Sequence, residues 1–163
     1  EYMEMIKLKT AVLYMASAEI GGLLAGASSE ELEALRSYGL NSGLAFQMID
    51  DVLGVSGVEE ELGKPVGSDI REGKKTIVVL EALSRLDDAG KRRLLGVLGD
   101  RGASRDRIIE AIRLIESSGA VEEAKRLARL YSSKAREALR RLPATDARRL
   151  LEALTDFIVE RRF

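Results

Sequence analysis

The sequence predicts an all-α protein, and three observations support this expectation. Apolar residues recur at intervals of three and four along nearly the whole chain of 163 residues, which is the spacing of amphipathic helices. No stretch alternates apolar and polar residues as a half-buried β-strand does. Only two prolines, Pro65 and Pro143, interrupt the chain. Because there is neither a repeat nor a low-complexity stretch, residues 1–163 are expected to form one helical domain.

The first two helices have the clearest signals. The first helix is expected over residues 1–25, with its apolar residues on one face. These apolar residues are Met3, Ile6, Leu13, Ile20 and Leu24. Ser28 and Glu31 have the spacing of a capping box, so a second helix is expected to start there and to run to near Gly54.

A loop and three short helices are expected in the middle of the chain. Residues 55–75 are rich in glycine and charge, which predicts a loop with one short helical turn. Helices follow near residues 76–86 and 88–98. Ser104 is placed to cap a further helix. The apolar residues of that helix are Ile108, Ile112 and Ile115.

Two more helices are expected in the C-terminal part of the chain. The first is long, because its apolar residues continue in steps of three and four. They are Val121, Ala124, Ala128, Tyr131, Ala135, Ala138 and Leu142. Thr145 is expected to start the last helix. The residues expected to point inward from it are Leu150, Leu154, Phe157 and Ile158.

The composition excludes several kinds of chemistry. The chain has no Cys, His or Trp. Without Cys there is no disulfide, thiol nucleophile or thiolate metal site. Without His there is no Ser-His-Asp triad and no histidine zinc site. Any bound metal would therefore be a hard cation held by oxygen atoms.

Charge is unevenly distributed along the chain. Residues 101–163 carry 15 basic and 10 acidic residues, whereas residues 1–100 carry 11 basic and 17 acidic ones. The basic segment alternates Arg and Glu along helical faces, and no aromatic residues are interleaved with its arginines. An ion-paired surface is therefore expected, and a nucleic-acid partner is the least favoured interpretation.

The chain shows no membrane or export signal. Its longest uncharged run, residues 37–49, is too short to span a bilayer, so we expect a cytoplasmic protein without an integral membrane segment. Glu1 lies inside an expected helix, which indicates a fragment or a processed chain. The first two helices are then expected to expose apolar surface that a missing part would cover. The residues concerned are Met3, Ile6, Leu13, Leu44, Phe46, Met48 and Ile49.

The most informative segment is GLAFQMIDDVLG, residues 43–54. Apolar side chains almost surround this helix, so it is expected to be buried, yet Asp50 and Asp51 lie near its C-terminal end. Burying an unpaired carboxylate is costly, so a metal ion, lysines or a water-filled cavity must compensate. Gln47 lies three and four residues earlier and shares the face of the two aspartates. The alternative is a pair that faces solvent at the end of a helix, as we expect for Asp87-Asp88, a capping pair among polar residues.

Basic residues follow this acidic helix end. Lys64 lies between Gly63 and Pro65, and Lys74 follows Gly73. Glycines let the backbone approach an anion, and lysines bind phosphate as point charges. Alone, such a loop is usually a solvated surface, and no Walker motif is present. Together with the acidic helix end, it suggests a metal and a phosphate group.

A third group lies near the start of the chain, at Lys9 and Thr10. Thr10 shares the expected inward face of the first helix with Ile6 and Leu13. Spacing alone favours a hydrogen bond from Thr10 to a carbonyl of its own helix. It also favours a surface position for Lys9.

Taken in the order in which they occur along the chain, these three groups resemble the C-terminal half of the trans-isoprenyl diphosphate synthases. The matching segments are KLKTAVL at 7–13, GLAFQMIDDVLG at 43–54 and GKPVGSDIREGKKT at 63–76. The archaeal and bacterial geranylgeranyl and polyprenyl diphosphate synthases look most similar. The resemblance covers essentially the whole chain but only about half of the family's length. It implies an all-α, isoprenoid-synthase-like helical bundle and a homodimer.

The resemblance also implies an activity, the condensation of an allylic diphosphate with isopentenyl diphosphate by magnesium-assisted ionisation. Two aspartate-rich motifs bind Mg²⁺ in the family, and Asp50 and Asp51 match the start of the second. Lys9, Lys64 and Lys74 match the lysines that contact the allylic diphosphate. The polar groups whose dipoles face the allylic carbocation correspond to Thr10 and Gln47. Lys9, Thr10 and Gln47 would thus be the catalytic residues of this chain.

Two departures from the family pattern leave an alternative open. The second motif usually ends in a third aspartate, where this chain has Gly54, and the first aspartate-rich motif is absent from the sequence. The 163 residues alone are therefore expected to be inactive and to need a missing N-terminal half or a partner chain. The alternative is a non-catalytic helical subunit or regulatory domain of the same family.

Overall fold

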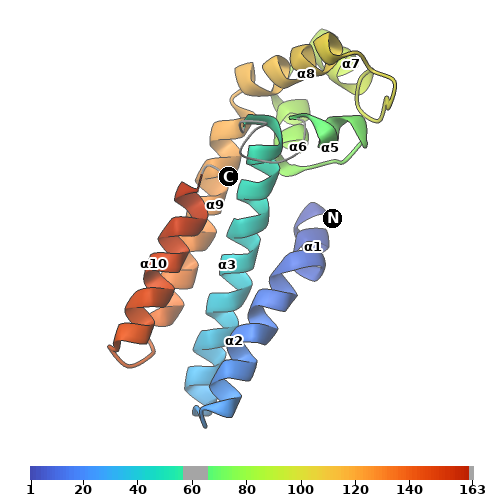
Figure 1. The fold of residues 1–163 in the computed structure, drawn as a ribbon. Helices are drawn as coiled ribbons and strands as arrows, with labels where there is room; N and C mark the ends of the chain where they lie inside the picture. The colour runs from blue at the N-terminus through green and yellow to red at the C-terminus, as the bar shows by residue number, and fades with distance from the viewer. Residues whose placement is uncertain (57–65, 162–163) are drawn as a thin grey trace. The chain divides into compact units, whose positions relative to one another are not determined.

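The computed structural model describes residues 1–56 and 66–161, and each regular element in these residues is a helix, as predicted (Figure 1). The elements are α1 (Tyr2–Ile6), η1 (Lys7–Ala11), α2 (Val12–Leu24), α3 (Ser29–Ser56), α5 (Ser68–Arg71), α6 (Ile77–Arg85), α7 (Asp88–Leu95), α8 (Arg105–Ser117), α9 (Ala120–Leu139) and α10 (Asp146–Glu160). None of these helices combines enough length with enough apolar character to pass through a lipid bilayer.

The described residues form two compact units. The first unit contains residues 1–49 and 126–161, so it combines both ends of the described chain. The second unit contains the described residues between 50 and 125. Helix α3 contributes most of its length to the first unit and its last two turns to the second.

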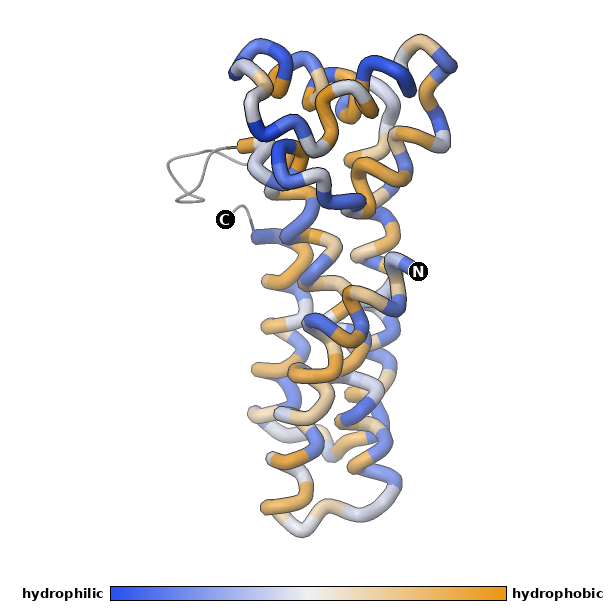
Figure 2. Tube along the Cα trace, turned by 90° about the vertical axis from the view of Figure 1, so that its right-hand side faces the viewer, coloured by the Kyte–Doolittle hydropathy of each residue, from blue (hydrophilic) through white to orange (hydrophobic). Residues whose placement is uncertain are grey.

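The first unit is a group of long helices around a small-residue core. Tyr38 of α3 packs with three residues of α9, and one residue each from α2, the α9–α10 connection and α10 completes the cluster. These six residues are Ala135, Ala138, Leu139, Ala18, Leu142 and Leu151. The hydroxyl of Ser132 donates to the carbonyl of Thr155 at 3.3 Å, which ties α9 to α10. Figure 2 shows polar and apolar residues alternating along these helices, as expected for helices that each bury one face.

The apolar face expected for the first helix is wrong beyond Ile6. Ile6 is fully buried, but Leu13, Ile20 and Leu24 are 71%, 55% and 85% exposed. The cause is η1, a π-helical turn that inserts an extra residue between α1 and α2. One extra residue rotates every later side chain by about 100°. The inward positions of α2 therefore include Ala18 and Gly22.

Glycines allow α3 to lie very close to the first helix. A methyl group on Gly39 would lie 2.6 Å from the carbonyl oxygen of Tyr14, and one on Gly43 would lie 2.5 Å from the Cα of Ala11. Both distances are shorter than a van der Waals contact, so only glycine fits. Gly39, Gly43 and Gln47 follow each other at intervals of four, which places them on one face of α3. This face is turned towards η1 and α2.

Apolar residues of α3 are more buried than expected. Phe46 is partly buried. The others are buried, and they are Leu44, Met48 and Ile49. The helix is covered from two directions, because the ring of Tyr14 lies 5.4 Å from that of Phe46 and the guanidinium of Arg161 lies 3.9 Å from the same ring. Most exposed large apolar residues of the first unit are instead found on α2 and α10.

The last two helices also depart from the predicted pattern. Helix α9 ends at Leu139, three residues before Leu142. Pro143 disfavours the helical conformation at Leu142, and the N–H groups of residues 140–142 bond instead to carbonyls three positions back. In α10, Ile158 is buried as predicted. Three residues predicted to point inward are exposed, namely Leu150, Leu154 and Phe157. This helix has apolar residues on more than one face, and the stripe with Leu151 packs inward.

The predicted helix starts are confirmed by their caps. The carboxylate of Glu31 accepts the backbone N–H of Ser28 at 2.8 Å, and the Ser28 hydroxyl accepts the N–H of Glu31 at 3.3 Å. Ser104 caps α8 by accepting the N–H of Arg107, and Thr145 caps α10 in the same way. Asp87 caps α7, as the interpretation of Asp87-Asp88 as a capping pair required.

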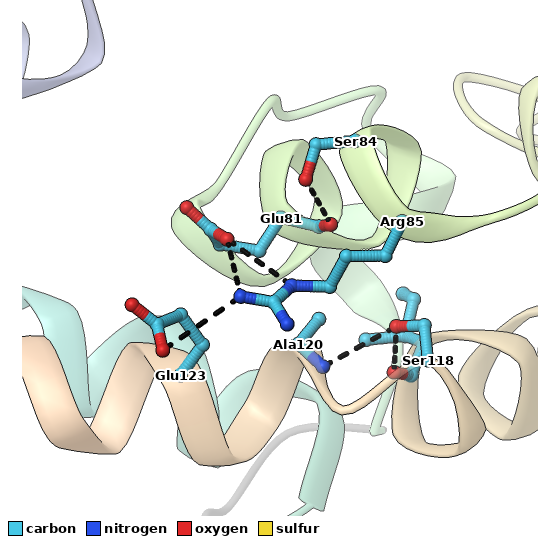
Figure 3. Close-up of polar contacts among 7 residues, drawn as sticks. Glu81, Ser84, Arg85, Ser118, Ala120 and Glu123 are labelled. Atoms are coloured by element: carbon cyan, nitrogen blue, oxygen red, sulfur yellow. Dashed lines mark hydrogen bonds and ion pairs between the residues drawn. The ribbon is translucent and has the colours of Figure 1, made fainter.

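In the second unit, an ion pair holds the start of α9 against α6 (Figure 3). The guanidinium of Arg85 lies 3.2 Å from the carboxylate of Glu81 on the same helix and 3.7 Å from that of Glu123 on α9. The hydroxyl of Ser118 accepts the N–H of Ala120 at 3.3 Å and so orders the turn before α9. These contacts fix the start of α9 against α6 within the second unit.

Candidate active site

Thr10 and Gln47 form a hydrogen-bonded pair in the first unit. The hydroxyl of Thr10 donates to the side-chain oxygen of Gln47 at 2.7 Å. Spacing alone had favoured a bond from Thr10 to its own helix, and the structure shows instead a bond across to α3. Gln47 is only 5% exposed, so its amide is fixed in an environment where a polar group must be hydrogen bonded.

The π-helical turn η1 positions this pair. It contains both Lys9 and Thr10, and π-helical turns often occur at functional sites. The close approach of α3 at Gly43 brings the backbone of η1 within reach of Gln47, one turn further along α3. Lys9 is exposed. Nothing in the spacing of the sequence signals the π turn.

The two adjacent aspartates have different environments in the second unit. Asp51 is 6% exposed, and one of its carboxylate oxygens accepts the backbone N–H of Ile77, the first residue of α6, at 3.2 Å. The positive end of a helix stabilises a carboxylate. Part of the cost of burying Asp51 is therefore offset by α6. Asp50 is partly exposed, so its carboxylate is the more accessible of the two.

Sequence reasoning considered a metal, lysines or a cavity as partners of these aspartates and missed the α6 N-terminus. A signal for it was present, because Thr76 precedes the apolar run that begins at Ile77 and marks a helix start. What the sequence could not show is that this helix start lies against Asp51.

Lys74 is held by two carboxylates of the second unit. Its ammonium nitrogen lies 2.7 Å from a carboxylate oxygen of Asp69 and 2.8 Å from one of Glu72. The hydrogen bond to Asp69, and then that to Glu72, raises the pKa of Lys74 well above its ordinary value. Lys74 is therefore fully charged at neutral pH. Lys64, the other predicted lysine of this loop, lies outside the described residues.

The backbone around Asp69 is fixed by hydrogen bonds between segments. Gly67, whose φ of +81° requires glycine, donates its N–H to the carbonyl of Gly54 at 2.9 Å. Lys74 donates its backbone N–H to the carbonyl of Asp69, also at 2.9 Å. The short helix α5 and the residues before α6 are thereby attached to the end of α3.

Magnesium fits the chemistry of the aspartates only if other ligands join them. Within residues 1–56 and 66–161, no three carboxylates gather in a way that could hold a metal ion. Mg²⁺ is commonly held by one or two carboxylates together with water and substrate phosphates. Asp50 and Asp51 supply the oxygen donors for such a shared ion, and Asp50 is the more accessible donor.

The hydrogen bonds described above join two of the predicted site residues and place Asp51 against another helix. Thr10 and Gln47 are in direct contact in the first unit, beside Lys9 in sequence. In the second unit, Asp51 meets the start of α6. Gln47 and the aspartates also share helix α3 at a spacing of three and four residues, which places them on one helical face.

Known proteins are similar to this chain in sequence. Residues 1–115 match the model of the polyprenyl synthetase family. The geranylgeranyl diphosphate synthase of Saccharolobus solfataricus is 42% identical over 99% of this chain and 49% of its own length. The geranylfarnesyl diphosphate synthase of Aeropyrum pernix is 44% identical over 99% of this chain and 50% of its own length.

The fold is shared with solved structures at similar identity. A polyprenyl synthase from Caulobacter crescentus matches with a TM-score of 0.94 and 43% identity, over 99% of this chain and 49% of that protein. The chain spans about half the length of the relatives that it matches. From the family match, the shared helices and the order of the motifs, we conclude that the chain belongs to the polyprenyl synthetase family.

Proposed function

We propose that this chain is the C-terminal half of a prenyl diphosphate synthase, which joins an allylic diphosphate to isopentenyl diphosphate. The observation that carries the proposal is the grouping of polar side chains near the C-terminal end of α3. There Gln47, already oriented by Thr10, lies within about one helical turn of Asp50 and Asp51. A fixed oxygen dipole and the accessible carboxylate of Asp50 on one helical face suit a substrate that separates into a cation and an anion.

The proposed reaction begins when the bond between the allylic carbon and the diphosphate oxygen breaks. The electron pair leaves with the diphosphate, and the allylic group becomes a carbocation. The double bond of isopentenyl diphosphate then attacks this cation, and loss of a proton restores a double bond in the longer product. Most of the barrier is the separation of charge, so oriented charges and dipoles are the main source of catalysis.

The residues of this chain have distinct roles in that step. Lys9, Lys64 and Lys74 bind the diphosphate oxygens and stabilise their growing negative charge. Lys74 suits this role because it is charged and half exposed. The oxygens of Thr10 and Gln47 face the positive charge on the allylic group. Asp50 and Asp51 would hold Mg²⁺, which when bound neutralises charge on the leaving diphosphate.

Two solved relatives support the choice of ligands. The Caulobacter crescentus polyprenyl synthase was solved in complex with calcium and isoprenyl diphosphate. A geranylgeranyl pyrophosphate synthase from Corynebacterium glutamicum, 31% identical to this chain, was solved with isoprenyl diphosphate and magnesium. The relatives named above are synthases, which favours the catalytic role over a non-catalytic subunit.

The test uses a complete synthase, in which residues 1–163 follow the part of the Saccharolobus solfataricus relative that this chain does not cover. In this complete synthase, Asp50→Ala should lower kcat by about 100-fold or more, because the lost carboxylate acts on the leaving group in the transition state. Asp88→Ala, at an exposed position in the first turn of α7, is the control and should leave kcat unchanged. A raised KM with normal kcat in Asp50→Ala would refute the assigned role.

A further inference from the structure

Lys74 has two carboxylate partners that differ in burial. Asp69 is 7% exposed as a residue, whereas the side chain of Glu72 is 51% exposed. Both lie at hydrogen-bond distance from the same ammonium group. A diphosphate that approaches this ammonium group is repelled by both carboxylates, so the carboxylate that can move away is the one that the diphosphate would displace.

Asp69 cannot easily turn away from Lys74. Its second carboxylate oxygen lies against Gly54, where an added methyl group would approach it to 2.9 Å. Its carbonyl accepts the backbone N–H of Lys74, so the two residues are joined by both main chain and side chain. The carboxylate is thereby fixed between the end of α3 and the ammonium group of Lys74.

Glu72 has no comparable support within the described part of the chain. It lies in the turn after α5, and an ion pair between exposed side chains is weak because water screens it and both side chains lose freedom. The ammonium group of lysine has three N–H donors. One can remain with Asp69 while the donor used by Glu72 passes to a ligand oxygen.

We propose that Asp69 is a positioning residue that holds Lys74 for the diphosphate, and that Glu72 is a competitor that the diphosphate displaces. This inference rests on the proposed function, because it takes Lys74 as a diphosphate ligand. It also gives Gly54 a role. The absence of a side chain at this position leaves room for the Asp69 carboxylate.

The two carboxylates are expected to have opposite effects on substrate binding. In the complete synthase, Asp69→Asn should raise the KM for the allylic diphosphate about tenfold or more, because tenfold corresponds to the lower end of the range for a hydrogen bond to a charged group. Loss of a negative charge alone would favour an anion, so a rise in KM identifies positioning. Glu72→Gln should lower the same KM by about two- to fivefold, as expected for loss of an exposed ion pair. The KM for isopentenyl diphosphate should not change.

A double-mutant cycle separates positioning from a general structural role. In a Lys74→Gln background, Asp69→Asn and Glu72→Gln should have no further effect on the KM for the allylic diphosphate. Asp100→Asn is the matched control, because Asp100 forms a 2.7 Å ion pair with Arg107 in the same unit. It should leave this KM unchanged. Thermal unfolding of each variant shows whether the fold is retained.

Each other outcome has a definite meaning. If Asp69→Asn raises the KM for the allylic diphosphate as much in the Lys74→Gln background as in the unchanged synthase, Asp69 is structural and the inference is wrong. If Glu72→Gln raises the KM, Glu72 is not a competitor. Glu72 is exposed, so this variant is informative even if Asp69→Asn does not fold. If Lys74→Gln itself leaves diphosphate binding unchanged, the proposed role of Lys74 in the function is wrong, and the inference is overturned with it.

Discussion

The hydroxyl of Thr10 orients the side chain of Gln47, because it occupies one lone pair of the amide oxygen and fixes the direction of the amide dipole. A carbocation benefits from such a dipole only if the dipole is oriented before the reaction. If the proposed function holds, the pair links a local hydrogen bond with the rate of the chemical step.

Replacing Thr10 tests this link. Thr10→Val keeps the shape but removes the donor to Gln47, so kcat of the complete synthase should fall about tenfold or more with little change in KM. Thr10→Ser keeps the hydroxyl and should retain most of the activity. Single-turnover measurements report the chemical step directly. Equal rates for the valine and serine variants would show that the hydroxyl does not act on the reaction.

Glu31 gives a prediction for the dependence of stability on pH. Hydrogen bonds from the backbone N–H and then the hydroxyl of Ser28 lower the pKa of Glu31. A carboxyl whose pKa is lower in the folded state stabilises the fold above its unfolded pKa of about 4.3. That stabilisation is lost as the pH falls through the lower, folded pKa.

The stability of Glu31→Ala should therefore approach that of the unchanged chain in acid. Urea unfolding at a series of pH values from 7 downwards measures the difference. We expect the variant to be less stable at neutral pH and the difference to shrink below the unfolded pKa of the carboxyl. A difference that does not change with pH would mean that the Glu31 carboxylate is not the stabilising group.

At the scale of elements, the approach of α3 to the first helix depends on glycine. Gly43→Ala would place a methyl group 2.5 Å from the Cα of Ala11. Backbone must move to relieve this clash, so the variant should lose about 1–3 kcal/mol of stability and weaken the bond between Thr10 and Gln47. Urea unfolding measures the first effect, and kcat of the complete synthase measures the second.

Gly21→Ala is the matched control for this prediction. A methyl group on Gly21, in α2, would have no neighbour within 4 Å. Alanine favours a helix over glycine by up to about 1 kcal/mol, so this variant should be as stable as the unchanged chain or more so. If the two variants behaved alike, the close contact at Gly43 would not limit the packing of α3.

The elements differ in how far the sequence predicts them. Helix starts at Ser28, Ser104 and Thr145 were predictable because a cap involves residues only three positions apart. The buried faces of α2 and α10 were not predictable. The π turn shifts the face of α2, and packing selects one of several apolar stripes on α10. These effects depend on contacts between residues far apart in sequence.

At the scale of the whole molecule, the order of motifs was enough to indicate the family, and the family model confirms it. Candidate site residues inside the motifs could be named from the sequence for the same reason, and their roles stay predictions. The hydrogen-bond partners of these residues could not be named from the sequence. Asp51 accepts a hydrogen bond from the start of α6, 26 positions away, and Thr10 donates one to Gln47, 37 positions away. Such contacts follow from the fold rather than from local spacing.

Apolar residues remain exposed on several helices of the first unit, most of them on α2 and α10. Leu13, Ile20 and Leu24 on α2 and Leu150 on α10 are more than half exposed. Large apolar surfaces are rarely left in contact with water. We therefore expect the 163-residue chain to self-associate in the absence of the N-terminal half. Its mass in solution, measured by light scattering, should exceed that of a monomer and fall towards a defined dimer in the complete synthase.

The most direct test of the account compares prenyl transfer by the 163-residue chain alone and by the complete synthase. Both are given an allylic diphosphate, isopentenyl diphosphate and Mg²⁺, and the product is measured. We predict product from the complete synthase only, because under the proposed function the isolated chain supplies only one of the two aspartate-rich motifs that would hold Mg²⁺ against the leaving diphosphate. Clear prenyl transfer by the isolated chain as a monomer, or no transfer by a folded complete synthase, would contradict the account.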